Sequence, residues 1–152
     1  MKAKRDNPVA RCGFTLVELV LVMFIIGVIG AIALPRFAQA NARQQLAAAA
    51  KRIESDLEKA RHQARANSNW VTIRFDTAAD SYEYAPMVGG NIHDIELDEA
   101  PYQVDITQAV FGSNANVSFN GFGVPTSGGK VVIKSAGGEA LITLDASGSV
   151  SR

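Results

Sequence analysis

The longest apolar run in the chain lies near its N-terminus, where residues 14–34 carry only two polar side chains, Thr15 and Glu18. As an α-helix this run would extend about 31 Å, enough to cross the hydrocarbon core of a membrane. A stretch with four basic residues precedes it, and no small-residue site of the A-x-A type closes it, so it differs from a cleaved secretory signal. The pattern predicts a retained transmembrane helix, and the basic stretch favours a cytoplasmic N-terminus.

Beyond Pro35 the apolar positions follow one face of a helix. They recur at intervals of three and four residues, at Leu46, Ala50, Ile53, Leu57, Ala60 and Ala64. Charged residues fill the positions between them, and we place these on the solvent face: Lys51, Arg52, Glu54, Asp56, Glu58, Lys59, Arg61 and Arg65. The helix is predicted to continue to Asn67. Pro35 removes the amide that would bond to the carbonyl of Ala31, so a kink or local melting is expected there.

Short alternating segments separated by turn residues fill the rest of the chain. In residues 70–75 every second side chain, from Val71 to Phe75, is apolar, and a second arm at 81–85 follows a turn. Further strands are expected near 92–97, 103–110, 116–120, 130–135 and 139–145, with glycines between them. The pattern predicts an α+β fold: one long N-terminal helix whose amphipathic half packs on one sheet of a small antiparallel β-sheet head.

The formal net charge is zero, but the charges are unevenly distributed. Residues 69–152 hold four basic and ten acidic side chains, about −6 in total. Modules that bind nucleic acid usually carry a concentrated basic face, so this composition disfavours nucleic acid as a partner. Cys12 is the single cysteine, which excludes an intrachain disulfide. It precedes the apolar run and follows Arg11, an arrangement unlike that of a lipidated cysteine.

Glu18 is the unusual residue of the apolar run. A carboxylate inside a membrane-spanning helix costs about 2.5–3.5 kcal/mol, and less near the end of the segment, so it requires a partner. No Lys, Arg or His lies within residues 14–34. Cleavage before Phe14 would create an α-amine four residues away, or on a neighbouring subunit, that could neutralise the carboxylate. Glu18 is therefore predicted to determine assembly between chains.

The residues around this glutamate resemble a known processing site. Residues 11–19, RCGFTLVEL, are similar to the prepilin peptidase site of type IV pilins and type II secretion pseudopilins. The resemblance implies cleavage after Gly13, N-methylation of Phe14, and Glu18 as the assembly carboxylate. Pro35 matches the proline at which the helix of this family commonly bends or loosens.

The head is similar to the GspH/FimT group of minor pilins and pseudopilins, through residues 57–64, 71–75, 119–125 and 141–150. This resemblance implies a structural, non-enzymatic subunit. Its segments would be a prepilin leader at 1–13, a transmembrane assembly helix at 14–34, an amphipathic continuation at 35–68 and a periplasmic β-rich head at 69–152.

Two roles are open under this resemblance. One is the H-type subunit of a type II secretion pseudopilus, which drives protein secretion. The other is a FimT-like minor pilin of a type IV pilus that serves pilus assembly or DNA uptake. In Gly148–Arg152, Ser149 replaces the first arginine of the basic motif with which some of these pilins bind DNA.

Both roles imply a single-pass protein of the bacterial inner membrane with its head in the periplasm, later built into a pseudopilus or pilus. The implied partners are other pilin or pseudopilin subunits, prepilin peptidase, an inner-membrane assembly platform and, for the first role, an exported protein.

Candidate metal ligands are sparse. Asp94, Glu96, Asp98 and Asp105 have a spacing like that of a calcium loop, but Glu99 stands where the loop needs glycine. The alternative is a strand or loop whose carboxylates face water and protect a sheet edge.

Candidate catalytic residues are equally few. His62 is placed on the charged side of the helix, and two histidines are too few for a zinc site. No nucleophile, base and orienting group stand together in the pattern. We expect no enzymatic activity, metal or cofactor, and we expect Trp70 to anchor the head where helix and sheet meet.

Overall fold

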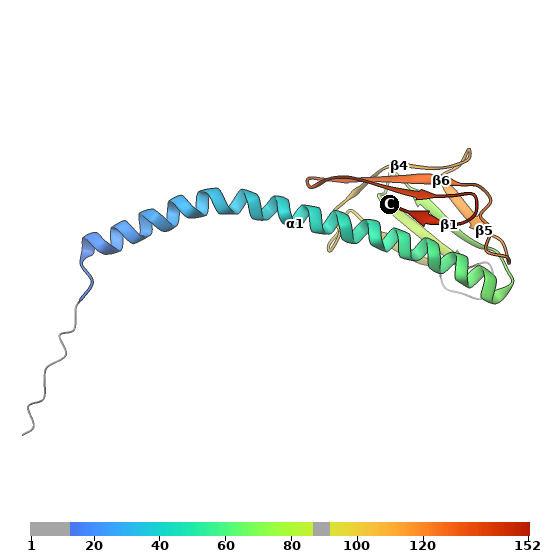
Figure 1. Cartoon of the computed structure of the whole chain (residues 1–152), viewed down its shortest axis with the longest axis horizontal. Helices are drawn as coiled ribbons and strands as arrows, with labels where there is room; N and C mark the ends of the chain where they lie inside the picture. The colour runs from blue at the N-terminus through green and yellow to red at the C-terminus, as the bar shows by residue number, and fades with distance from the viewer. Residues whose placement is uncertain (1–12, 87–91) are drawn as a thin grey trace, which may run out of the picture. The chain divides into compact units, whose positions relative to one another are not determined.

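The computed structural model describes residues 13–86 and 92–152. Within them the chain has one helix and eight strands, and Met1–Phe37 and Ala38–Arg152 form two compact units. Helix α1 (Leu16–Asn67) contributes to both units and continues through Pro35 (Figure 1). The predicted long helix is therefore confirmed. Melting at Pro35 is not observed, and the kink stays a prediction.

A C-terminal cap ends α1 and turns the chain into the head. Ser68 adopts a left-handed conformation with φ of 48°. Its amide donates to the carbonyl of Arg65 at 3.2 Å, and the amide of Asn69 donates to that of Ala64 at 3.1 Å. These two bonds form a Schellman motif, which satisfies carbonyls that the helix leaves free.

The head contains two antiparallel sheets. Its strands are β1 (Val71–Asp76), β2 (Ser81–Pro86), β3 (His93–Glu96), β4 (Asp105–Phe111), β5 (Asn116–Phe119), β6 (Gly129–Ser135), β7 (Gly138–Leu144) and β8 (Val150–Ser151). The sheet orders are β3-β2-β1-β5 and β4-β6-β7-β8. The first seven strands lie close to the predicted ranges. The eighth was not predicted, because two residues are too few to show an alternation.

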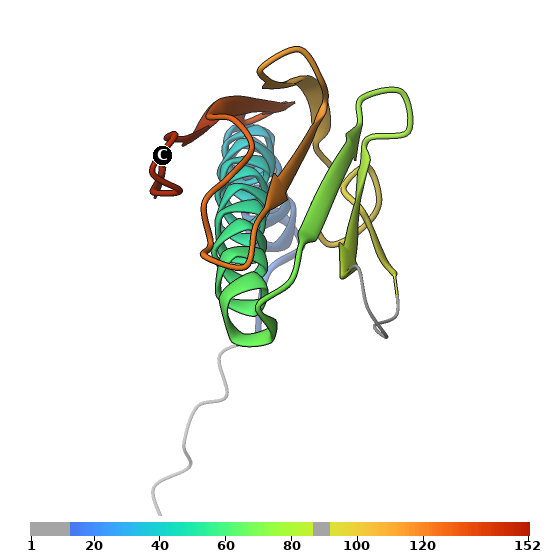
Figure 2. The ribbon, with the colours of Figure 1, turned by 90° about the vertical axis from the view of Figure 1, so that its right-hand side faces the viewer.

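The expectation that α1 packs on one sheet is wrong, because α1 contacts both. A tight turn connects β4 to β5, yet the two strands belong to different sheets. β5 pairs with β1 in the first sheet, and β4 pairs with β6 in the second. Tyr82 of the first sheet bonds to Asp56 of α1 at 2.7 Å. Ser135 of the second sheet donates to the carbonyl of Ala42 at 3.4 Å. Figure 2 shows the strands gathered along one side of the C-terminal half of α1.

The predicted apolar stripe of α1 forms part of the core of the head. All six of its residues are buried, together with Ala49. They join one hydrophobic cluster with buried side chains of both sheets, such as Ile73 and Ile133. In β1 burial alternates as predicted, with Val71, Ile73 and Phe75 inside. Each large apolar side chain buried in this way contributes about 1.5–3 kcal/mol.

Asp56 contradicts its predicted place on the solvent face of α1. Its side chain is buried, and it accepts hydrogen bonds from Arg52 Nε at 2.8 Å and from the Tyr82 hydroxyl at 2.7 Å. Burial and the bond to Asp56 raise the pKa of Tyr82 well above its usual range. The aspartate is tolerated inside because a cation one turn earlier and a hydroxyl from β2 both reach it.

Replacing this carboxylate should destabilise the head. Asp56→Ala leaves the Tyr82 hydroxyl buried without a partner, which we expect to cost about 2–3 kcal/mol. A urea titration of the full chain in detergent, followed by near-UV circular dichroism, measures the loss. Glu58→Ala, an exposed carboxylate on the same helix, should change stability by less than about 0.5 kcal/mol. Equal effects of the two substitutions would contradict the assignment.

Candidate assembly site

The predicted processing residues lie at the start of α1. Gly13 is the first described residue, and beyond its chain neighbours no described residue lies within 4 Å of the position that a Cβ would take there. The side chain of Phe14 is 76% exposed. Residues 1–12, with Cys12 and most of the predicted leader, lie outside the described residues. A bond between Gly13 and Phe14 is therefore accessible in this structure, and cleavage there stays a prediction.

Thr15 and Glu18 together begin the helix. The amide of Glu18 donates to Thr15 Oγ1 at 3.2 Å, so Thr15 is the N-cap. Glu18 stands at the third helical position, where a carboxylate also interacts favourably with the helix dipole. Sequence reasoning overlooked this cap, although the T-x-x-E spacing is its signature. Glu18 thus has a local role in addition to any role between chains.

No cation in the described part of this chain neutralises Glu18. Within residues 13–86 and 92–152 the ion pairs are Lys51–Glu54 at 3.1 Å and Arg52–Asp56 at 2.8 Å. Glu18 is exposed and lies in the first turn of an apolar helix. In a membrane or a helix bundle its charge would therefore need a partner from another molecule, or from the N-terminal amine, as the sequence suggested.

The first part of α1 carries a continuous apolar surface. Every large apolar side chain in residues 14–37 is exposed, from 43% at Val22 to 79% at Leu16 and Phe37. An 18-residue window of α1 has a mean hydropathy of 2.8, and none of it is buried within the chain. By length and composition this helix could cross a membrane. Such a surface is covered in the cell by lipid or by other apolar helices.

At the other end of α1, two arginines bind the loops of the head. Arg61 donates to the carbonyl of Gly148 at 2.8 Å, and Arg65 Nε donates to the carbonyl of Phe122 at 2.8 Å. Both side chains were predicted to lie on the solvent face; Arg65 is exposed as predicted, and Arg61 is half-buried. Neither contact with a loop carbonyl was predicted. The sequence signal for these contacts was the glycines of the two loops.

Two glycines allow one of these loops to approach α1. A Cβ at Gly121 would lie 2.8 Å from the backbone carbonyl carbon of Ser68. Gly123 has φ of 74°, and a Cβ there would lie 2.5 Å from Arg65 Nε. Residues 119–125, which carried part of the family resemblance, are thus shaped by contact with the end of the helix. The two glycines of this segment therefore allow the loop to pack against the end of α1.

The acidic cluster does not form a calcium loop in this structure. Asp94 and Glu96 lie in β3, the edge strand of its sheet, and both are exposed. In the described residues no group of three or more His, Cys, Asp or Glu side chains could hold a metal ion. The arrangement agrees with the alternative of charges that protect a sheet edge.

His62 and Trp70 have ordinary surroundings. His62 is exposed on α1 as predicted. Trp70 lies between α1 and β1, as expected. It is 42% exposed, so only part of its surface packs against the head.

Comparisons with known proteins agree with this arrangement. Residues 9–34 match the model of the prokaryotic N-terminal methylation motif, and residues 49–148 match the model of the Type II transport protein GspH. The chain belongs to the GspH family. The family consists of structural pilin-like subunits, so this GspH-family chain is a minor pilin or pseudopilin that assembles with other pilin subunits. A search of curated proteins gave no match.

A solved structure supports the fold of the GspH-family chain. The type IV minor pilin FimU of Pseudomonas aeruginosa matches 72% of this chain and 88% of its own, with a TM-score of 0.52 and 15% sequence identity. At this identity the match shows a shared fold, a long helix packed on antiparallel sheets. The α+β pilin-like prediction is therefore confirmed.

Gly121→Ala should loosen the loop from the helix. The added methyl group would overlap the backbone of Ser68, and we expect a loss of about 1–3 kcal/mol in head stability. Thermal unfolding of the full chain in detergent measures it. Ser113→Ala, in an exposed turn between β4 and β5, is the control and should have little effect. An unchanged unfolding midpoint for Gly121→Ala would contradict the close contact.

Proposed function

We propose that this protein is the H-type minor pseudopilin of a type II secretion system, made as a prepilin and built into a periplasmic pseudopilus. The observation that carries the proposal is the exposed apolar helix that begins at Leu16, close after Gly13 and Phe14, with Glu18 in its first turn. In the described part of the chain no cation pairs with this carboxylate. The GspH family match over the head supports the choice of secretion system.

Assembly follows from burial of the apolar surface of residues 14–37 between subunits. Every large apolar side chain there is exposed in the single chain, so bundling with neighbouring helices provides packing contacts along the whole segment. Prepilin peptidase removes residues 1–13 and leaves the α-amine of Phe14. In the filament this amine, from the same or a neighbouring subunit, neutralises Glu18, and the pairing fixes the axial position of one helix against the next.

Before assembly the subunit waits in the inner membrane with its head in the periplasm. The basic stretch before the apolar run favours this orientation. The N-terminus then faces the peptidase and the assembly platform. The head is left to contact other minor pseudopilins or an exported protein.

A FimT-like minor pilin of a type IV pilus is the second candidate. One observation favours it: Arg43 and Arg152 line one cleft of about 320 Å³ beside β7, a pair of cations that phosphates would bind. Glu139 lines the same cleft, which weakens that attraction. Deleting the gene separates the two roles, because loss of protein secretion favours the first and loss of pili or DNA uptake favours the second.

The mature chain should begin with N-methylated Phe14. We expect intact mass and N-terminal sequencing of the membrane-bound protein to show this terminus in cells with prepilin peptidase. In cells without the enzyme the chain should begin at Met1. A chain that keeps Met1 in the presence of peptidase, or that is cut near Leu34, would exclude processing as a prepilin.

Glu18→Gln should block assembly without affecting the helix cap. The change removes the charge but keeps the backbone amide that binds Thr15. We expect the fraction bound to other pilin-like subunits, measured by chemical crosslinking in cells followed by fractionation, to fall on the order of tenfold or more because the amine loses its counter-ion. Glu58→Gln makes the same chemical change on the exposed surface of the head and should assemble normally. Normal assembly of Glu18→Gln would remove Glu18 from the mechanism.

A further inference from the structure

A cleft between the end of α1 and the first sheet is lined by two aromatic side chains that face water. Its volume is about 330 Å³, and Ser68, Trp70, Asn120, Gly121 and Phe122 line it. The Trp70 side chain is 42% exposed and that of Phe122 is 81% exposed. Leaving a phenylalanine in water forgoes about 1.5–3 kcal/mol that burial would provide.

The loop that carries Phe122 is held by its own hydrogen bonds. The side-chain oxygen of Asn120 accepts from the amides of Phe122 and Val124, both at 3.0 Å. The backbone of Asn120 bonds to Gly123 at 2.7 Å and to Val124 at 3.0 Å. None of these bonds uses the aromatic ring. The loop therefore projects Phe122 from a preformed turn.

The same loop is fastened to α1. Arg65 Nε donates to the Phe122 carbonyl, and Gly121 packs against the backbone of Ser68. An aromatic side chain on a fixed backbone turn requires no ordering of the loop on binding, so it is a suitable anchor for a protein interface. Val124, in the same loop and 43% exposed, adds apolar surface.

The charge beside the cleft is basic, although the head as a whole is acidic. Arg65 is exposed, belongs to the last turn of α1 and donates to the carbonyl of Phe122 in the cleft loop. The residues that line the cleft include no carboxylate. A partner surface that combines an apolar side chain with acidic residues would therefore fit here.

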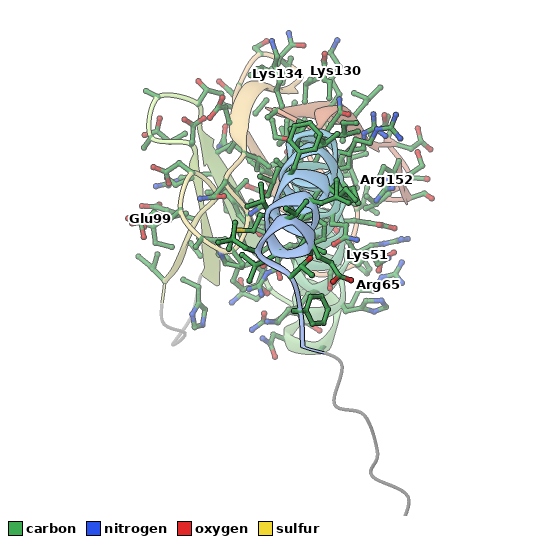
Figure 3. The ribbon with its side chains drawn as sticks, turned by 90° about the vertical axis from the view of Figure 1, so that its left-hand side faces the viewer. Lys51, Arg65, Glu99, Lys130, Lys134 and Arg152 are labelled. Carbon is green, nitrogen blue, oxygen red and sulfur yellow. The ribbon has the colours of Figure 1, made fainter. Side chains whose placement is uncertain are left out.

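An acidic loop lies at the opposite end of this head, where α1 also carries Arg43. Asp98 and Glu99 are exposed in the loop before Gln103, and Gln103 bonds to Gln45 of α1 at 2.9 Å. Gln45 and Arg65 are twenty residues apart in the helix, about 30 Å along its axis. In Figure 3, Glu99 and Arg65 appear on different sides of the head. A basic aromatic end and an acidic end suit head-to-tail contact between similar subunits.

We propose that the cleft at Trp70 and Phe122 docks the acidic end of another pilin-like head in the same filament. The proposal rests on the proposed function, because it requires that the chain assemble with such subunits. Phe122 inserts as the apolar anchor, and Arg65, which binds the Phe122 carbonyl, attracts the acidic residues around it. One arginine is a small footprint for nucleic acid, whose binding depends on many phosphate contacts.

Photo-crosslinking from the anchor position tests the contact. The full chain carries p-benzoylphenylalanine in place of Phe122 and is expressed in cells with prepilin peptidase and the other pilin-like subunits. Irradiation should join it to a subunit that has its own N-terminal methylation motif, through a peptide from an acidic loop of the head. The same photoreactive residue at Leu141, a half-exposed position on β7, should give at least about tenfold less of that product.

The outcomes separate this inference from the proposed function. A link to lipid, nucleic acid or an exported protein would overturn the docking site. So would the absence of any link while the chain is processed and still co-purifies with its partner subunits. If the chain is neither processed nor assembled, the proposed function fails and this inference fails with it.

A substitution gives a second measurement that does not depend on the crosslinker. Phe122→Ser removes the ring and keeps the backbone bonds of the loop, so the head should unfold at an unchanged temperature. We expect co-purification of the crosslinked partner from detergent extracts to fall on the order of tenfold. Leu141→Ser is the matched control and should retain the partner. Unchanged co-purification for Phe122→Ser would contradict the anchor role.

Discussion

The structure depends on burial of one stripe of α1 between two sheets. Residues from Leu46 to Ala64 lie in a single hydrophobic cluster with side chains from strands that are far apart in the sequence. Polar contacts then fix one strand and two loops on the helix. Asp56 binds Tyr82 in the middle of the head, and Arg61 and Arg65 bind loop carbonyls near its end. Burial of the stripe against the apolar side chains of both sheets stabilises the head, and the polar contacts define one arrangement.

The same helix carries a second apolar surface that its own head does not cover. Residues 14–37 have the hydropathy of a membrane-spanning segment, and their large side chains are all exposed in the single chain. A helix of this kind is stable only in lipid or among other apolar helices. Assembly with other pilin subunits therefore follows from an exposed apolar surface and from a carboxylate, Glu18, that pairs with no cation in the described residues.

The proposed docking site would add specificity to this general means of assembly. Apolar helices pack with many partners, whereas an aromatic side chain on a fixed turn beside an arginine accepts fewer surfaces. The loop at 119–125 packs on α1 through its glycines and also carries the exposed side chain of Phe122. A minor subunit that meets particular neighbours in a filament would need such a surface.

The sequence by itself determined the features that depend on neighbouring residues. The apolar run, the helical stripe and the alternation in β1 were readable because each repeats over a few residues, and Gly13, Phe14 and Glu18 form one contiguous motif. Tertiary structure decided what depends on distant partners. β1 pairs with β5 some forty residues later, which divides the strands into two sheets. Asp56 is buried because β2 places Tyr82 beside it, and Phe122 is exposed because Arg65 and Ser68 hold its loop. Periodicity in the sequence shows which face of a helix or strand is apolar. The residues that bind a buried carboxylate or determine the exposure of an aromatic side chain come from distant parts of the chain.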